Sequence, residues 1–164
     1  MCCRLFVINC YGANIMRRVT IEKQLPVSAE QAYKTISDFK QFEKHCAAVI
    51  SIGVNKISDT QSDSTWKVHF HDGEMCWREK DIFNNQELTI DFNQLEGDAE
   101  EFYGRWIVET VSSNRAKVCF EASFCMGIPT LADILEPIAE TAITNNINNM
   151  LTELFITETE GEPA

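Results

Sequence analysis

Two acidic side chains separated by one residue are the strongest candidates for chemistry in this chain. Glu79 and Asp81 lie in the segment Met75–Phe83, where large apolar residues alternate with polar ones. In a strand, alternate side chains share a face, so the phase that turns Trp77 inward also turns both carboxylates inward. The opposite phase would bury two cations in place of Trp77. We therefore expect both acids on the inner face of a sheet.

Such a pair can do acid–base chemistry. The two carboxyl groups would lie roughly 7 Å apart along the strand. In a partly dry pocket the pKa of one member rises, which provides one acid and one base near neutrality. The alternative is a position at the open end of the sheet, where both groups are solvated or paired with Arg or Lys.

The histidines and cysteines form no catalytic or metal-binding pattern. His69 and His71 are in the phase opposite to Trp66, which predicts an outer face. His45 and Cys46 are adjacent, and adjacent residues rarely orient as a nucleophile and its base. The seven cysteines show no C-x-x-C and no zinc-ligand spacing, which is typical of free thiols in a cytosolic protein. We expect no metal and no cofactor, because the chain also lacks a phosphate loop and a serine elbow.

The elements that must position the two acids form a sheet. A first strand, Val19–Leu25, ends at Pro26 and is followed by a capping box, Ser28–Gln31, which opens a helix to about Ile36. Asp38 can cap a second short helix, Phe39–His45. Six further strands follow without an intervening helix, which predicts an antiparallel sheet. They are Val49–Lys56, Thr65–His71, Met75–Phe83, a strand around Leu88–Phe92, Phe102–Val111 and Lys117–Met126, with an acidic loop at 96–101.

The end of the chain predicts a long helix, from Leu131 to about Thr157, with a bend near Pro137. Its apolar residues recur at helical spacing: Leu131, Ile134, Leu135, Ile138, Ala142, Ile147, Leu151, Leu154 and Phe155. The expected fold is α+β: a curved seven-stranded antiparallel sheet wrapped around this helix, with two short helices after the first strand. One helix does not fill such a concavity, so we expect an internal cavity.

Strand alternation assigns the side chains that face this cavity. Besides the two acids they are Trp66, Phe70, Trp77, Phe92, Gln94, Phe102, Trp106, Phe120 and Phe124. This wall suits a large, flat, mostly apolar ligand held by a few hydrogen bonds. A filled hydrophobic core explains each aromatic residue equally well, and both interpretations stay open here.

Length and charge limit the function further. The chain has 164 residues, the size of one domain. We expect the domain at 16–157, an N-terminal extension at 1–15 with Met16 as a plausible start, and an acidic tail at 158–164. The net charge is 14 − 25 = −11, which argues against nucleic-acid binding. Residues 1–50 carry 7 − 4 = +3 and residues 51–164 carry 7 − 21 = −14. No apolar run reaches the length of a membrane span, and a cytoplasmic location is expected.

Several segments, in this order, resemble the helix-grip SRPBCC (START-like) superfamily and, within it, the polyketide cyclase/aromatase branch. The resemblance extends over roughly Arg17 to Phe155. The segments that carry it are Pro26–Tyr33, Ser37–Phe42, Cys76–Asp81, Glu96–Trp106 and Gly127–Leu135.

This resemblance implies a protein that holds a poly-β-ketone chain in its cavity and promotes aldol cyclisation and dehydration. The corresponding family strand often carries Trp, Ser and Arg at alternate positions. Here Trp77 fits, but Glu79 and Asp81 occupy the other two positions. A carboxylate proton shuttle therefore replaces an arginine-stabilised enolate. Tyr33 and Gln94 are candidate orienting groups for the substrate.

Other partners and functions remain open. Relatives of the same fold include non-catalytic carriers of quinones or lipids and ribosome-associated proteins, although the acidity of the chain disfavours the latter. An acyl carrier protein is acidic, so it would dock at the basic N-terminal region, with Arg17, Arg18 and Lys23. The chain is expected to be a monomer or a homodimer.

Overall fold

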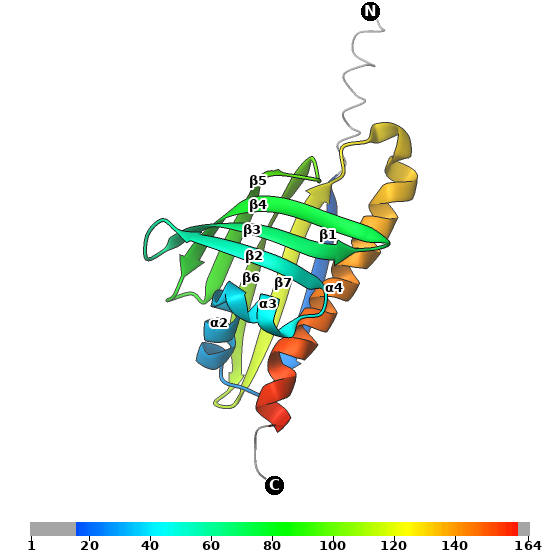
Figure 1. Cartoon of the computed structure of the whole chain (residues 1–164). Helices are drawn as coiled ribbons and strands as arrows, with labels where there is room; N and C mark the ends of the chain where they lie inside the picture. The colour runs from blue at the N-terminus through cyan, green and yellow to red at the C-terminus, as the bar shows by residue number, and fades with distance from the viewer. Residues whose placement is uncertain (1–15, 161–164) are drawn as a thin grey trace, which may run out of the picture.

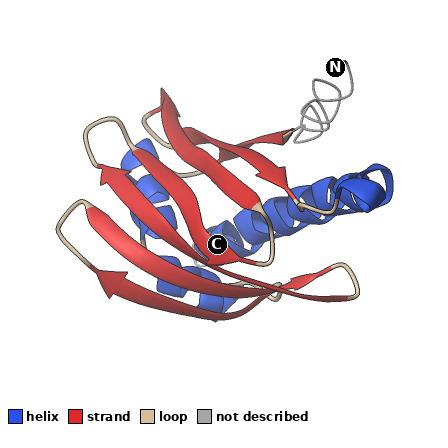
Figure 2. Cartoon of the chain, turned by 90° about the horizontal axis from the view of Figure 1, so that it is seen from above, coloured by secondary structure: helices blue, strands red, loops and turns tan. Residues whose placement is uncertain are grey.

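Seven antiparallel strands form one curved sheet around a long helix in the computed structural model of the protein, which describes residues 16–160 (Figures 1 and 2). The strand order is β1-β7-β6-β5-β4-β3-β2. This is the expected α+β helix-grip fold. In chain order the elements are β1 (Arg17–Leu25), α2 (Ala29–Ser37), α3 (Phe39–His45), β2 (Val49–Lys56), β3 (Gln61–Phe70), β4 (Gly73–Asn84), β5 (Thr89–Gly97), β6 (Glu101–Ser112), β7 (Arg115–Cys125), a 3-10 turn (Pro129–Leu131) and α4 (Ala132–Glu160).

The two short helices close one side of the concave sheet (Figure 1). Ser28 caps α2, because its Oγ accepts a hydrogen bond from the Gln31 backbone N–H at 3.2 Å. Asp38 occupies the N-cap position of α3, but its side chain does not cap the helix. Its carboxylate accepts a hydrogen bond from the Gln41 side chain at 3.1 Å instead. Phe39 and Phe42 turn from α3 into the core.

Strand β3 begins four residues earlier than its expected start at Thr65. The inward alternation of Trp66 and Val68 therefore continues back to Ser62 and Ser64, both of which are buried. Serine and aspartate are typical of turns, which concealed this part of the strand in the sequence. The acidic loop is likewise shorter than expected, since β5 extends to Gly97 and β6 begins at Glu101.

A bulge in β5 adjusts the sheet beside the two acids. The ladder between β4 and β5 shifts register between Arg78 and Glu79, which leaves Leu95 as an extra residue in β5. Beyond the bulge, Gly97 is opposite Trp77. A Cβ atom on Gly97 would lie 2.5 Å from the Trp77 Cβ, so only glycine permits this close approach.

Helix α4 covers the concave face from Glu136 onward. Its buried side chains are Glu136, Ala139, Ile143, Ile147, Met150, Leu151, Leu154 and Phe155. Two of the apolar residues that recur at helical spacing, Leu131 and Ile134, are not buried: they are 44% and 61% exposed. The first turns project past the sheet, so the apolar pattern continues where no strand remains to cover (Figure 2). Pro137 lies within the helix, and α4 reaches Glu160.

Two expectations concern residues that the structure does not fully describe. The extension at 1–15 lies outside the described residues, as do Cys2, Cys3 and Cys10. The four cysteines within 16–160 are free thiols: Cys46, Cys76, Cys119 and Cys125. Over the same range, none of the helices has the length and apolar character that crossing a membrane requires.

Candidate active site

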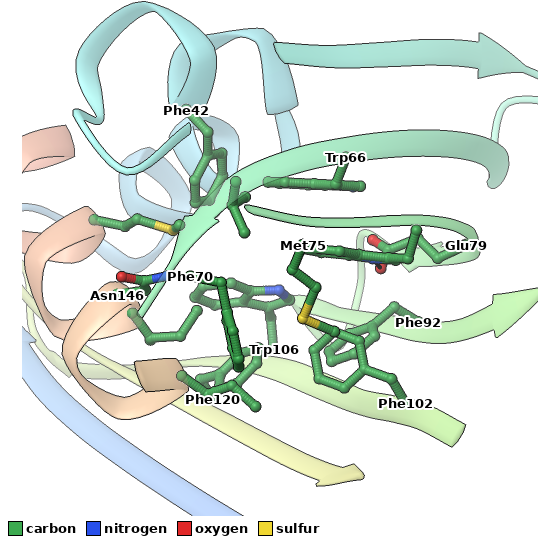
Figure 3. A pocket seen from close by; sticks show the side chains of 15 residues that line it. Phe42, Trp66, Phe70, Met75, Glu79, Phe92, Phe102, Trp106, Phe120 and Asn146 are labelled. Carbon is green, nitrogen blue, oxygen red and sulfur yellow. Dashed lines mark hydrogen bonds between the residues drawn. The ribbon is translucent and has the colours of Figure 1, made fainter. Parts of the chain in front are cut away.

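A narrow cavity lies between the concave face of the sheet and helices α3 and α4 (Figure 3). Its volume is about 60 Å³, counted as the space that the centre of a water molecule can reach. The wall is almost entirely apolar. It consists of Phe42, Trp66, Val68, Phe70, Met75, Trp77, Glu79, Phe92, Phe102, Trp106, Phe120, Ile143, Asn146, Ile147 and Met150.

Aromatic rings form most of the wall. The indoles of Trp66 and Trp77 stack at 5.8 Å with an interplanar angle of 4°. Phe92 and Phe120 stack at 5.6 Å and 11°. Phe102 meets Trp77 edge-on at 5.5 Å. Flat faces and edges of this kind favour a planar ligand.

The polar end of the cavity is a cluster of five side chains, Ser64, Trp66, Trp77, Glu79 and Asp81, which we call the carboxyl cluster. The Ser64 hydroxyl donates to Asp81 Oδ2 at 2.6 Å and lies 3.4 Å from Glu79 Oε1. Trp66 Nε1 donates to Ser64 Oγ at 2.9 Å, and Trp77 Nε1 donates to Glu79 Oε2 at 2.7 Å. The two indoles thus hold both the serine and one carboxyl group in place.

Burial changes the ionisation of both acids. Glu79 is 5% exposed and Asp81 is 0% exposed. Loss of solvent raises the pKa of Glu79 well above its ordinary value, and the charge of Asp81 and hydrogen bonding to Asp81 raise it further. Burial also raises the pKa of Asp81, to about 6, with hydrogen bonds from Glu79 and Ser64 opposing the rise. Burial therefore favours a protonated pair, with Glu79 as the more basic of the two groups.

The expected alternative, a solvated or ion-paired position, does not describe this pair. Among the ion pairs of residues 16–160, none involves Glu79 or Asp81. Arg78, between them in sequence, points to the other face and pairs with Asp63 and Glu96. Within this part of the chain, the negative charge of the pair is stabilised by neutral hydrogen-bond donors.

The two acids differ in access. Glu79 lines the cavity, whereas Asp81 lies behind it and does not. Asp81 Oδ1 is buried without a hydrogen-bond partner among the described residues. A ligand in the cavity therefore meets Glu79 directly and Asp81 only through Glu79.

The structure brings together most of the side chains expected at the site. Seven of the residues expected to bind a ligand line the cavity: Trp66, Phe70, Trp77, Phe92, Phe102, Trp106 and Phe120. Three others do not. Tyr33 borders an outer groove and donates to the Thr89 carbonyl at 3.1 Å. Gln94 donates to the Ala99 carbonyl at 2.8 Å, and Phe124 is fully packed in the core.

Sequence reasoning missed five residues of the site: Ser64, Phe42, Ile143, Asn146 and Met150. The first was hidden by the late expected start of β3. Phe42 belongs to α3, and the alternation of strands says nothing about a helix. Ile143, Asn146 and Met150 lie on α4, and a continued recurrence of apolar residues at i, i+3 and i+4 could have identified the two apolar ones. No pattern in the sequence singles out Asn146, whose Nδ2 donates to the His69 carbonyl at 2.8 Å.

Other candidate groups do not join the site. His69 and His71 are exposed, as expected. The Cys46 thiol is buried and lies 3.7 Å from the Met150 carbonyl. Burial, followed by the charge of Glu153, raises the pKa of this thiol to about 12, so it is not a thiolate at neutral pH. No group of three or more His, Cys, Asp or Glu residues within 16–160 could hold a metal ion.

Comparisons with known proteins concern the family and the fold of the chain. The sequence profile of a family described as "Polyketide cyclase / dehydrase and lipid transport" matches residues 25–151. No curated protein sequence matches the chain. The fold is similar to that of TTHA0849 from Thermus thermophilus, with 18% identity, a TM-score of 0.81, and coverage of 90% of this chain and 100% of the other.

Two enzymes with comparably low sequence identity also share the fold. The Zhui aromatase/cyclase from Streptomyces sp. R1128 is 16% identical, with a TM-score of 0.75 and coverage of 85% of this chain and 93% of the other. Norcoclaurine synthase from Thalictrum flavum, in complex with dopamine and hydroxybenzaldehyde, is 13% identical, with a TM-score of 0.71 and coverage of 96% and 94%. At such identities the likeness concerns the fold.

Proposed function

The chain belongs to the polyketide cyclase / dehydrase and lipid transport family, and on that premise we propose that it is an aromatase/cyclase acting on a poly-β-ketone chain. The observation that carries this proposal is the buried carboxyl pair, in which burial raises the pKa of both groups and which presents only Glu79 to an aromatic cavity. A protein that only binds and transports an apolar ligand does not require such a pair. Burial of two acids lowers the stability of the fold, so the pair needs another explanation.

Aldol cyclisation needs a base and then an acid at one place. In the resting pair Glu79 carries the proton. Transfer of this proton to Asp81 leaves Glu79 as a carboxylate facing the substrate. Glu79 then removes a proton from the carbon between two ketones, and the resulting enolate carbon bonds to a second carbonyl carbon. The new alkoxide takes that proton back from Glu79, so the step consumes and releases no proton.

Dehydration repeats the cycle. Glu79 removes the next α-proton, and the hydroxyl leaves with a proton supplied through the same carboxyl group, so that water is the product. Asp81 never touches the substrate and acts as the proton store behind Glu79. The cavity wall determines the regiochemistry. It sets the conformation of the bound polyketide, and this conformation decides which carbonyl carbon lies beside the enolate carbon.

The cavity must widen to admit a substrate. Its volume of about 60 Å³ is well below the roughly 300–1,000 Å³ of most ligand sites. Met75, Met150 and Phe70 line it, and the two methionines are the side chains best able to change rotamer. Ligand binding thus involves repacking of this wall.

A second function, binding and transport of a flat apolar ligand without catalysis, is favoured by the aromatic wall alone. Docking of an acidic carrier protein at the basic N-terminal strand is a further proposal. Contacts within the protein reduce the number of basic groups that are available to such a partner. Arg17 pairs with Glu140 at 2.8 Å, and Lys23 donates to Thr152.

The test compares Glu79→Gln with Glu96→Gln, the same change on the outer face of the sheet, in a reconstituted polyketide synthase. We expect Glu79→Gln to abolish the cyclised product while a planar aromatic probe still binds, and Glu96→Gln to leave both unchanged. Normal product from Glu79→Gln would refute the proton shuttle. Normal product without the protein at all would refute the cyclase and leave the transport function.

A further inference from the structure

Ser64 is a buried hydroxyl that lies between the two carboxyl groups and within reach of both. We infer that Ser64 is a positioning residue, which decides which carboxyl group carries the shared proton and keeps that proton on Glu79. Only its consequence for turnover rests on the proposed function; the protonation state itself is a property of the free protein.

The geometry of Ser64 is asymmetric. Its oxygen lies 2.6 Å from Asp81 Oδ2 but 3.4 Å from Glu79 Oε1. A hydroxyl has one hydrogen to donate, and the short contact is the one that uses it. A hydrogen bond to an ionised oxygen is stronger than one to a neutral acid. The hydroxyl therefore favours the state in which Asp81 is the carboxylate.

Trp66 supports this arrangement, whereas Trp77, whose N–H donates to Glu79, favours the ionised form of that carboxyl group and opposes it in part. Trp66 Nε1 donates to Ser64 Oγ at 2.9 Å. This hydrogen bond occupies one lone pair of the Ser64 oxygen, so the hydroxyl hydrogen points away from Trp66. Trp77 Nε1 donates to Glu79 Oε2 at 2.7 Å, so Oε2 is an acceptor and Oε1 is left to carry the proton. The proton thus lies on the oxygen of Glu79 nearer to Ser64.

The described elements around the pair bring no unpaired charge that would compete with Ser64. On β5 the register partners of the two acids are Gln94 and Phe92, both uncharged. On β3 the charge of Asp63 acts on Asp81, but Asp63 pairs with Arg78 at 3.3 Å. The described cavity residues of α3 and α4 are Phe42, Ile143, Asn146, Ile147 and Met150, which are all uncharged.

The strand provides a matched control for this inference. Ser62 is on the same face of β3, is 7% exposed and is the register partner of Asp81. The hydrogen bonds found among the described residues include none from Ser62 to either carboxyl group. Ser62→Ala and Ser64→Ala therefore remove the same atom from the same face, and only the second removes a donor to the pair.

The experiment is a pH titration of the free protein with carbon-13 NMR of the Asp and Glu carboxyl carbons. In Ser64→Ala we expect the ionisation of Asp81 to move upward from about 6 by about one pKa unit, because a donor to the carboxylate is lost. Ser62→Ala is expected to titrate like the wild type. Ser64→Thr, which keeps the hydroxyl, restores the wild-type value.

An unchanged titration in Ser64→Ala, or an equal shift in Ser62→Ala, would overturn the inference. Ser64→Cys, with a weaker donor of similar size, gives an intermediate shift and serves if Ser64→Ala does not fold. The outcome is separable from that of the proposed function. If no variant or wild type cyclises a polyketide but the titration shifts, the inference about Ser64 stands and the cyclase proposal falls.

Discussion

Glu79 and Asp81 are separated by one residue, yet their surroundings differ. Glu79 faces the cavity and is held by an indole N–H, whereas Asp81 lies behind it and is held by a hydroxyl. Alternation along one strand was enough to predict that both are inward. The difference in their contacts involves Ser64, whose position was concealed by turn-like residues at the start of β3.

The pH dependence of turnover follows from this pair. Below about pH 6 Asp81 takes up a second proton, and the pair then has no base. Above that pH Glu79 can act as the base, and the proton that it removes from the substrate is the one that it returns. We expect kcat/KM for cyclisation to rise with pH through an acid limb near pH 6. Asp81→Asn removes the group that accepts the proton of Glu79, so we expect turnover near neutral pH to fall and the acid limb to follow the ionisation of Glu79 alone; an acid limb that stays near pH 6 in this variant would assign it to another group.

The same burial predicts a cost in stability. The pKa of Asp81 rises from 3.8 to about 6 on folding, so the folded state binds the proton more tightly than the unfolded state. The free energy of unfolding therefore decreases as pH rises from about 4 to about 6, and the penalty persists above that range. We expect Asp81→Asn to be more stable than the wild type at pH 7 by up to about 3 kcal/mol.

This stability prediction is checked by urea unfolding at two values of pH. At pH 4 the two proteins should differ little, because Asp81 is protonated in the folded state. A variant that is less stable than the wild type at pH 7 would show that the hydrogen bonds of the carboxylate outweigh its desolvation.

At the scale of the elements, the bulge in β5 affects both the packing of Trp77 and the hydrogen bond that Trp77 donates to Glu79. It places Gly97 opposite Trp77, where a side chain has no room. We expect Gly97→Ala to displace the Trp77 indole and to destabilise the fold by about 1–3 kcal/mol. The displaced indole no longer donates to Glu79, so the activity should fall as well. Gly53→Ala is the control, since the nearest atom to its added Cβ is 3.9 Å away.

Most elements were predictable because their patterns are local. The two short helices, the antiparallel order and the long final helix all follow from periodicity and capping residues. The bulge was not predictable, since it is a property of two strands in register rather than of one sequence segment. Helical spacing does not show where the sheet ends, so it does not distinguish the exposed Leu131 and Ile134 from the residues of α4 that are buried.

For the molecule as a whole, a hydrogen bond joins the sheet to α4 at the wall of the cavity. Asn146 donates to the His69 carbonyl at 2.8 Å and so joins the helix to the end of β3. Both Asn146 and the neighbouring Phe70 line the cavity. Widening of the cavity at this point requires the hydrogen bond to open.

We expect Asn146→Ala to speed both association and dissociation of a planar aromatic probe, by about two- to tenfold, with a smaller change in Kd. Stopped-flow mixing measures both rates. The Asn148→Ala variant, on an exposed position of the same helix, is the control. Equal rates in wild type and Asn146→Ala would place the route of the ligand elsewhere.

All three tryptophans of the chain lie in the wall of one cavity: Trp66, Trp77 and Trp106. The tryptophan fluorescence of the protein therefore comes entirely from the candidate active site. Two of these indoles are hydrogen-bonded to other members of the carboxyl cluster, so a change in its ionisation alters their emission directly. The native protein thus carries its own optical reporter, and a fluorescence screen of unlabelled compounds can identify the ligand without knowledge of the reaction.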